Sequence, residues 1–275
     1  MSADPLAVEG RRSSAGAGEP RGLAPQAVVQ GVADPPPKPW GFWATLAWGL
    51  AAFGVTLLVQ YAVILGWAMR HPQLDIGDVW RNGSLLAAIL IISTPIQIGI
   101  FVAAARLARY PVAAYFGLNL PRRRDVAIGI ACLATLLAAF EVLAAALGES
   151  DVTSRGFAEV YRAARAGDPA PFAWLTIAAV LFAPAGEEIM FRGFLLRGWA
   201  RSRRTVVPAV LATALIWALM HVQYDWLPML QVFSIGVLFG WLRQRSGSTT
   251  LTILLHALTN LGAMVESALR VEWLG

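Results

Sequence analysis

Charged residues and cysteines are scarce in this chain of 275 residues. Only 14% of the residues are charged, whereas soluble domains carry roughly 25%, so an ordinary soluble domain is excluded. Cys132 is the one cysteine, which excludes an intramolecular disulfide scaffold. Histidine is also rare, with three in the whole chain, and each one inside an apolar segment needs an explanation.

Apolar residues make up 57% of the sequence, and they gather in stretches that approach the ~20 residues needed to cross a bilayer. Seven such stretches occur, at residues 41–69, 84–107, 126–147, 172–189, 206–220, 227–242 and 251–264. The last four are short and carry polar residues, so the expected number of spans is about seven, within a range of six to eight. The sequence therefore predicts an all-α fold, a polytopic bundle of transmembrane helices.

The chain divides by composition into a tail and two membrane regions. Residues 1–39 are rich in Ala, Gly and Pro and lack a sustained apolar pattern, which predicts a disordered tail. Residues 40–170 are expected to hold three spans and residues 171–275 four. Lys and Arg concentrate in alternate connections, most clearly in the three arginines at 122–124, which places the amino terminus on the cytoplasmic side.

The same placement explains the net charge of +5, because basic loops on one side of a membrane need no nucleic-acid partner. The Ala- and Arg-rich composition indicates a bacterial source with GC-rich codons. We therefore expect an integral protein of the bacterial inner (cell) membrane, with the lipid bilayer as its surroundings and no nucleic acid as a partner.

A few polar side chains lie inside the apolar stretches, where an ionisable group is expensive and is by default a candidate for function. They are Glu141, Glu187, Glu188, Arg192, His221, His256 and Asn260. All of them except Glu141 lie in the last third of the chain. Glu141 is expected to pack between helices, and no role is assigned to it.

Helical geometry separates the two adjacent glutamates. Glu188 and Arg192 are four residues apart with the acid first, which favours an ion pair on one helix face. Glu187 projects from a different face, so the two carboxylates are not expected to address one centre. The pattern predicts one structural carboxylate, neutralised by Arg192, and one carboxylate available for chemistry. The same spacing puts Trp217 with His221, and His256 with Asn260, on shared faces.

These residues resemble the motifs of the CPBP family of intramembrane proteases, which includes CAAX prenyl endopeptidases and bacteriocin-processing enzymes. The family pattern is EExxxR, then FxxxH, then HxxxN or HxxxD. Here it reads EEIMFR from Glu187, WALMH from Trp217 and HALTN from His256, within residues 171–265. Trp217 stands where Phe is usual, and this exchange is expected to alter the shape of the pocket more than the chemistry.

The resemblance implies a catalytic core at residues 171–275 that cleaves a membrane-associated protein or peptide. By this analogy Glu187, assisted by His221, activates a water, and His256 and Asn260 donate hydrogen bonds to the oxyanion. Glu188 and Arg192 then hold the helix end. Prenylated carboxyl termini, bacteriocin-like precursors and carboxyl-terminal sorting tails all stay open as substrates.

The mechanism implied by the resemblance needs no cofactor or metal, but other interpretations of the same residues remain. Zinc held by Glu187, His221 and His256 is one alternative, although the HExxH pattern of zinc proteases is absent. A haem between His221 and His256 is another. A noncatalytic scaffold or immunity-type protein of the same family is a third, and a proton-coupled transporter using Glu141 and Glu187 is a fourth.

Two expectations concern local geometry. For the acid and the histidine to meet inside the bilayer, the fourth helix should continue to about Trp199 and the fifth should continue past His221, with a bend near Pro184. Gly236 and Gly240, one turn apart, should mark a place where two helices pack closely.

Overall fold

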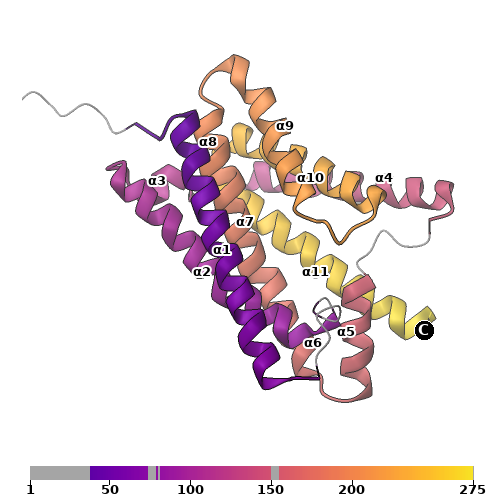
Figure 1. The fold of residues 1–275 in the computed structure, drawn as a ribbon. Coiled ribbons are helices and arrows are strands. Elements are labelled where there is room, and N and C mark those ends of the chain that lie inside the picture. The colour runs from indigo at the N-terminus through magenta and orange to yellow at the C-terminus, as the bar shows by residue number, and fades with distance from the viewer. Residues whose placement is uncertain (1–37, 74–78, 80, 150–154, 275) are drawn as a thin grey trace, which may run out of the picture. The chain divides into compact units, whose positions relative to one another are not determined.

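The structure is a computed structural model that describes residues 38–73, 79, 81–149 and 155–274. Every element in these ranges is helical, which confirms the predicted all-α class (Figure 1). Residues 1–37 of the predicted tail lie outside the described residues. The helices are α1 (Phe42–Arg70), α2 (Gly83–Leu107), α3 (Val112–Phe116), α4 (Arg123–Leu147), α5 (Arg155–Ala166), α6 (Ala170–Ile177), α7 (Ala183–Glu188), α8 (Leu196–Trp199), α9 (Arg203–Leu219), α10 (Trp226–Ser246) and α11 (Thr249–Leu274).

Six helices of the described chain are long and apolar enough to cross a membrane, so it is a polytopic helical bundle. They are α1, α2, α4, the continuous helix Ala170–Trp199, α10 and α11. The fifth expected stretch, at residues 206–220, forms α9, which has 17 residues and is shorter than the other six. The number of long spans therefore lies at the lower limit of the predicted range.

The fourth span is one continuous helix that changes its winding twice. It comprises α6, a π-helical turn at Ala178–Phe182, α7, a second π-helical turn at Ile189–Leu195, and α8. Pro184 follows the first π turn and has no backbone N–H to give to the preceding turn, so a locally widened helix fits there. The expectation that this helix continues to Trp199 is confirmed, and both glutamates lie between its two π turns.

The fifth helix does not continue past His221, and that expectation was wrong. Helix α9 ends at Leu219, and the His221 backbone N–H turns back to the Ala218 carbonyl at 2.9 Å. The reason is local sequence, because the apolar pattern stops here and Asp225 occupies the N-cap position of α10. His221 therefore lies in the short connection between α9 and α10.

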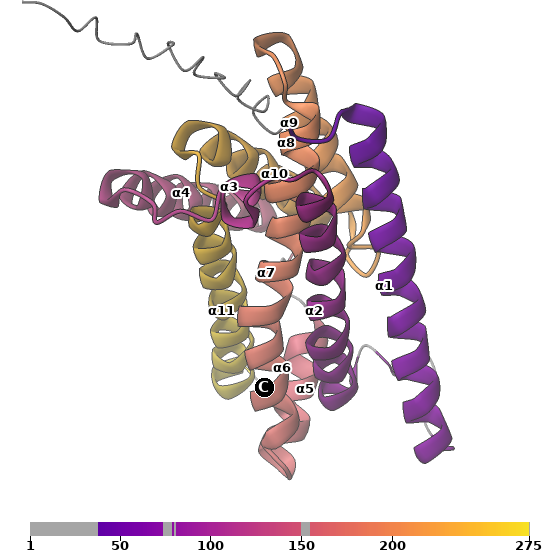
Figure 2. The ribbon, with the colours of Figure 1, turned by 90° about the vertical axis from the view of Figure 1, so that its left-hand side faces the viewer.

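Helix α7 lies between α2 and α11, which brings the glutamates into the interior of the bundle (Figure 2). On another side, α9 and α10 pack closely at the predicted glycine pair. A Cβ atom on Gly236 would lie 2.9 Å from the Ala214 Cβ, and one on Gly240 would lie 2.8 Å from Val210. This confirms the small-residue contact and leaves no room for larger side chains.

Candidate active site

Three helical segments contribute polar side chains to one cluster in the interior. The fourth span supplies Glu187, Glu188 and Arg192, α9 supplies Trp217, and α11 supplies His256. Four of these five residues are buried, and Glu187 is the partly exposed member, with 28% of its side chain accessible. The cluster therefore has one carboxylate that the rest of the described chain leaves partly uncovered.

Arg192 and Glu188 form a fully buried ion pair. The Arg192 Nη1 atom donates to Glu188 Oε1 at 2.9 Å, and Nη2 donates to the Gly236 carbonyl of α10 at 3.2 Å. The guanidinium also lies over the ring of Trp217, 4.5 Å from its centroid, and 5.5 Å from that of Phe239. A buried charge needs a partner, and here the ion pair and the cation–π contacts with Trp217 and Phe239 provide it. These contacts hold the fourth span against α9 and α10.

His256 lies between the two glutamates. Its Nδ1 atom is 3.0 Å from Glu188 Oε1, and its Nε2 atom is 4.0 Å from Glu187 Oε2. The expectation that Glu187 and Glu188 address separate centres was therefore wrong. The two carboxylates do leave the helix in different directions, but the two nitrogens of one imidazole also point in different directions and reach both.

Glu188 orients the ring of His256 and also neutralises Arg192. A carboxylate accepts hydrogen bonds, so the network assigns the proton on Nδ1 of His256 as the donor to Glu188. The Nε2 atom is then the nitrogen that faces Glu187 and the exposed side of the cluster. The Glu188 carboxylate thus sets the orientation of the His256 ring, and this leaves Nε2 facing Glu187.

Trp217 binds the available carboxylate directly. Its Nε1–H donates to Glu187 Oε2 at 2.5 Å, and its ring packs edge-on against His256, with centroids 5.3 Å apart. A Phe at this position would have no such donor. The exchange of Phe for Trp was expected to change the shape of the pocket, but the indole N–H was the available signal that the residue contacts Glu187.

His221 and Asn260 lie at the edge of the cluster. His221 Nδ1 is 2.8 Å from the carbonyl of Trp217, and its ring stacks on Tyr224. Within the described residues no hydrogen bond or ion pair joins His221 to Glu187. Asn260 donates from Nδ2 to the Ala179 carbonyl at 2.7 Å, in the first π turn of the fourth span. The structure thus places both residues next to partners of the cluster and not on Glu187 itself.

Helix α2 adds polar side chains that sequence analysis did not single out. Ser93, Thr94 and Gln97 are buried, and Gln97 Nε2 lies 3.4 Å from the sulfur of Met190, a weak acceptor. A Cβ on Gly186 would lie 2.9 Å from Thr94 and 3.0 Å from Gln97 Oε1. Three polar residues at i, i+1 and i+4 in an otherwise apolar span were the signal that this face meets the site.

The remaining candidates lie apart from this cluster. In the described part of the chain, no three His, Cys, Asp or Glu side chains are gathered so that they could hold a metal ion. Glu141 is half exposed and lies 3.9 Å from Arg270 of α11, which agrees with a contact between helices.

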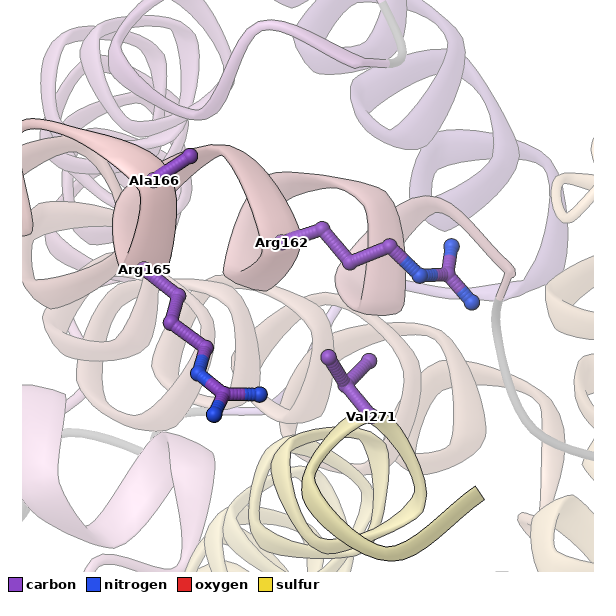
Figure 3. Close-up of a pocket in the computed structure, with 4 residues that line it drawn as sticks. All are labelled: Arg162, Arg165, Ala166 and Val271. Atoms are coloured by element: carbon purple, nitrogen blue, oxygen red, sulfur yellow. The ribbon is translucent and has the colours of Figure 1, made fainter. Parts of the chain in front are cut away.

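A cavity of about 370 Å³ lies elsewhere, between α5 and the carboxyl-terminal part of α11 (Figure 3). It is lined by Arg162, Arg165, Ala166 and Val271, none of which belongs to the predicted motifs. Arg165 forms an ion pair with Glu272 at 3.2 Å. This cavity therefore contains no carboxylate and imidazole arranged for chemistry.

The cluster itself has the parts of a hydrolytic site. Glu187 is a solvent-accessible carboxylate held by an N–H donor, and an imidazole nitrogen lies opposite it. A general base needs both access to water and a fixed position. Residues 169–262 match the family model of the Rce1-like type II CAAX prenyl endopeptidases. This segment belongs to the CPBP/CAAX protease family.

The matched segment contains all three motifs and every residue of the cluster described above. Members of this family are intramembrane proteases, so a peptide or protein substrate and a membrane location follow at that level. No curated protein and no solved structure matches the chain. The amino-terminal helices α1, α2 and α4 lie outside the matched segment.

Proposed function

We propose that this protein is an intramembrane endopeptidase in which Glu187 activates a water that attacks a peptide bond of a membrane-associated protein or peptide. The observation that carries the proposal is the exposure of Glu187. It is the one partly accessible member of a buried cluster of five, and both Trp217 and His256 are aimed at its Oε2 atom.

In the first step, Glu187 takes a proton from water, and the hydroxide adds to the scissile carbonyl carbon. The Trp217 N–H holds one carboxylate oxygen and orients the group toward the water. The proton on Glu187 then passes to the leaving amine as the C–N bond breaks. The water thus supplies a hydroxyl to the new carboxyl group and a proton to the leaving amine, so the reaction is a simple hydrolysis.

Two donors are proposed for the oxyanion that forms in between. His256, whose Nε2 atom faces Glu187, donates one hydrogen bond to the oxyanion when both ring nitrogens carry protons. Asn260 has a second N–H besides the one bound to the Ala179 carbonyl, and this second donor completes the pair. His221 supports the Trp217 backbone from the α9–α10 connection and is proposed to assist Glu187 through it.

The test compares wild type with Glu187→Gln in membranes, using mass spectrometry to score the cleavage of a library of membrane-anchored peptides. Glu141→Gln is the matched control, because it neutralises another glutamate of a span that lies outside the cluster. Cleavage should fall by about 10²- to 10⁴-fold in Glu187→Gln and persist in Glu141→Gln.

A chelator and an absorption spectrum separate the alternatives. Cleavage that survives the chelator supports a glutamate-activated water, whereas cleavage that the chelator abolishes would require a metal. A Soret band in the purified protein would favour haem between the histidines. Equal cleavage by wild type and Glu187→Gln would overturn the proposal.

A further inference from the structure

Two arginines at one end of the bundle have no acidic partner among the residues that the structure describes. Arg197 lies in α8 and Arg243 in the last turn of α10. They lie where α3 and the ends of α2, α8 and α10 meet the starts of α4 and α11. We call this region the basic end.

The hydrogen-bond partners of both arginines are neutral. Arg197 donates from Nη2 to the hydroxyl of Tyr110 at 2.7 Å, and its guanidinium lies over the rings of Tyr110 and Tyr115. Arg243 is 9% exposed and donates from Nε to the hydroxyl of Thr249 at 2.8 Å. Burial raises the pKa of the Tyr115 hydroxyl, so this tyrosine stays protonated and supplies no negative charge.

No carboxylate of the described chain neutralises the pair. Among the described residues, the basic end has one acidic side chain, Asp125 at the start of α4, and it pairs with Arg245 at 3.4 Å. The charge that acts on Arg243 is instead a second cation, Arg197. The Nε atom of Arg197 is buried and has no hydrogen-bond partner in the described part of the chain.

Buried arginines in proteins are paired, because an unpaired buried charge is strongly destabilising. Arg243 is such a buried charge, and Arg197, which is partly exposed, adds a second positive charge nearby that repels it. A phosphate group removes both penalties at once. It carries negative charge, and its oxygens match the forked donors of guanidinium groups. Basic pockets between helices near a membrane surface are typical binding places for anionic lipid headgroups.

We propose that Arg197 and Arg243 together bind a phosphate group, that of an anionic membrane lipid whose headgroup lies at the basic end. The tyrosines contribute to the same place, because Tyr side chains prefer the headgroup region and Tyr110 already holds Arg197 in position. This binding site is separate from the cluster around Glu187 and does not depend on proteolysis.

The arginines beside the α5 cavity do not offer an equal alternative. Arg165 there is neutralised by Glu272, and Arg81 nearby is bound to Glu159 at 2.7 Å. A cation that already has a carboxylate gains less from a phosphate. Arg162, which also lines the cavity, is exposed and its charge is solvated, whereas Arg243 at the basic end is buried.

The experiment uses the full-length protein, purified and stripped of lipid in a neutral detergent. Phosphatidylglycerol, phosphatidylcholine or inorganic phosphate is added, and bound lipid is counted by native mass spectrometry while the thermal midpoint is recorded. For wild type, phosphatidylglycerol should bind and raise the midpoint, and phosphatidylcholine should do so far less. Equal effects of the two lipids would overturn the proposal.

Variants locate the binding. Arg197→Gln should weaken phosphatidylglycerol binding by about 10- to 100-fold, because it removes a charged donor. Arg204→Gln is the matched control, since it neutralises an exposed arginine at the start of α9, and it should bind as wild type does. Binding by Arg197→Gln equal to that of wild type contradicts the proposal.

Two further arms keep the result decisive. If Arg197→Gln does not fold, Arg197→Lys keeps the charge but loses the fork, and it should bind more weakly than wild type. If inorganic phosphate alone gives the full rise in midpoint, the phosphate chemistry is supported and the lipid as its source is refuted.

Discussion

Arg192 and Arg243 are two buried arginines of the same bundle, and they differ in what balances their charge. Arg192 has Glu188 at 2.9 Å, and Glu188 in turn binds His256. Arg243 has a threonine hydroxyl and a second arginine nearby. Among the described residues, the chain thus supplies a carboxylate to Arg192 and none to Arg243. This difference underlies the two proposals, a catalytic cluster around Glu187 and a phosphate-binding site at the basic end.

The largest expected effect comes from breaking the balanced cluster. Arg192→Met leaves Glu188 buried without its cation and should lower the free energy of unfolding by about 3 to 5 kcal/mol. Unfolding in mixed detergent micelles measures it. The double variant Glu188→Gln/Arg192→Met removes both charges and should recover part of the loss. If the double variant loses as much stability as Glu188→Gln and Arg192→Met lose together, Glu188 does not neutralise Arg192.

The donor to Glu187 is tested by Trp217→Phe, which keeps an aromatic ring and removes the N–H. Because hydrogen bonds to charged groups contribute about 1.5 to 3 kcal/mol, the cleavage rate should fall by about 10- to 100-fold. The thermal midpoint, measured alongside, should change little. A rate equal to that of wild type would mean that Trp217 only shapes the pocket.

A third substitution disturbs the backbone carbonyl that binds Arg192 and removes no charged group. Gly236→Ala places a Cβ about 2.9 Å from that of Ala214 and shifts the carbonyl that accepts from Arg192. Forcing extra atoms into a packed contact costs about 1 to 3 kcal/mol. Unfolding in the same micelles gives the value, and Gly54→Ala, which meets nothing within 4 Å, is the control. Equal stability of the two variants would contradict the close contact of α9 and α10.

The smallest effect is expected at the basic end. Arg243→Met loses one hydrogen bond to Thr249 but relieves the repulsion with Arg197, so it should cost about 1 kcal/mol or less in lipid-free micelles. Adding phosphatidylglycerol should then stabilise wild type and not this variant. A cost as large as that of Arg192→Met would show that the basic end is already balanced within the chain.

Much of the fold follows from the sequence because apolar stretches of membrane length leave few alternatives to helices. The end of the fourth helix at Trp199 was predictable from the need to bring Glu187 inside. The end of the fifth helix was not, because α9 stops at Leu219 and Asp225, at the N-cap position of the next helix, makes no side-chain capping hydrogen bond that would mark the boundary. The π turns around the glutamates also have no simple sequence signal apart from Pro184.

The sequence singles out all five residues of the cluster but not most of the contacts that join them, and it also names His221 and Asn260, which lie at the edge. The spacing of Glu188 and Arg192 indicates their ion pair, because i,i+4 neighbours meet on any helix. That His256 reaches both Glu187 and Glu188 depends on how α11 packs against α7, which no local pattern encodes. Gln97 was missed for the same reason, because its neighbours Gly186 and Met190 lie about 90 positions away in the sequence.

The most direct test of the central claim is the single-turnover cleavage rate of Glu187→Gln in purified protein reconstituted into lipid, relative to wild type. The substrate is a peptide that wild type cleaves, and Glu141→Gln is measured alongside. The account predicts a folded protein with an unchanged thermal midpoint and a rate at least about 100-fold lower, with Glu141→Gln near the wild-type rate. A Glu187→Gln protein that cleaves within a few-fold of wild type would contradict it.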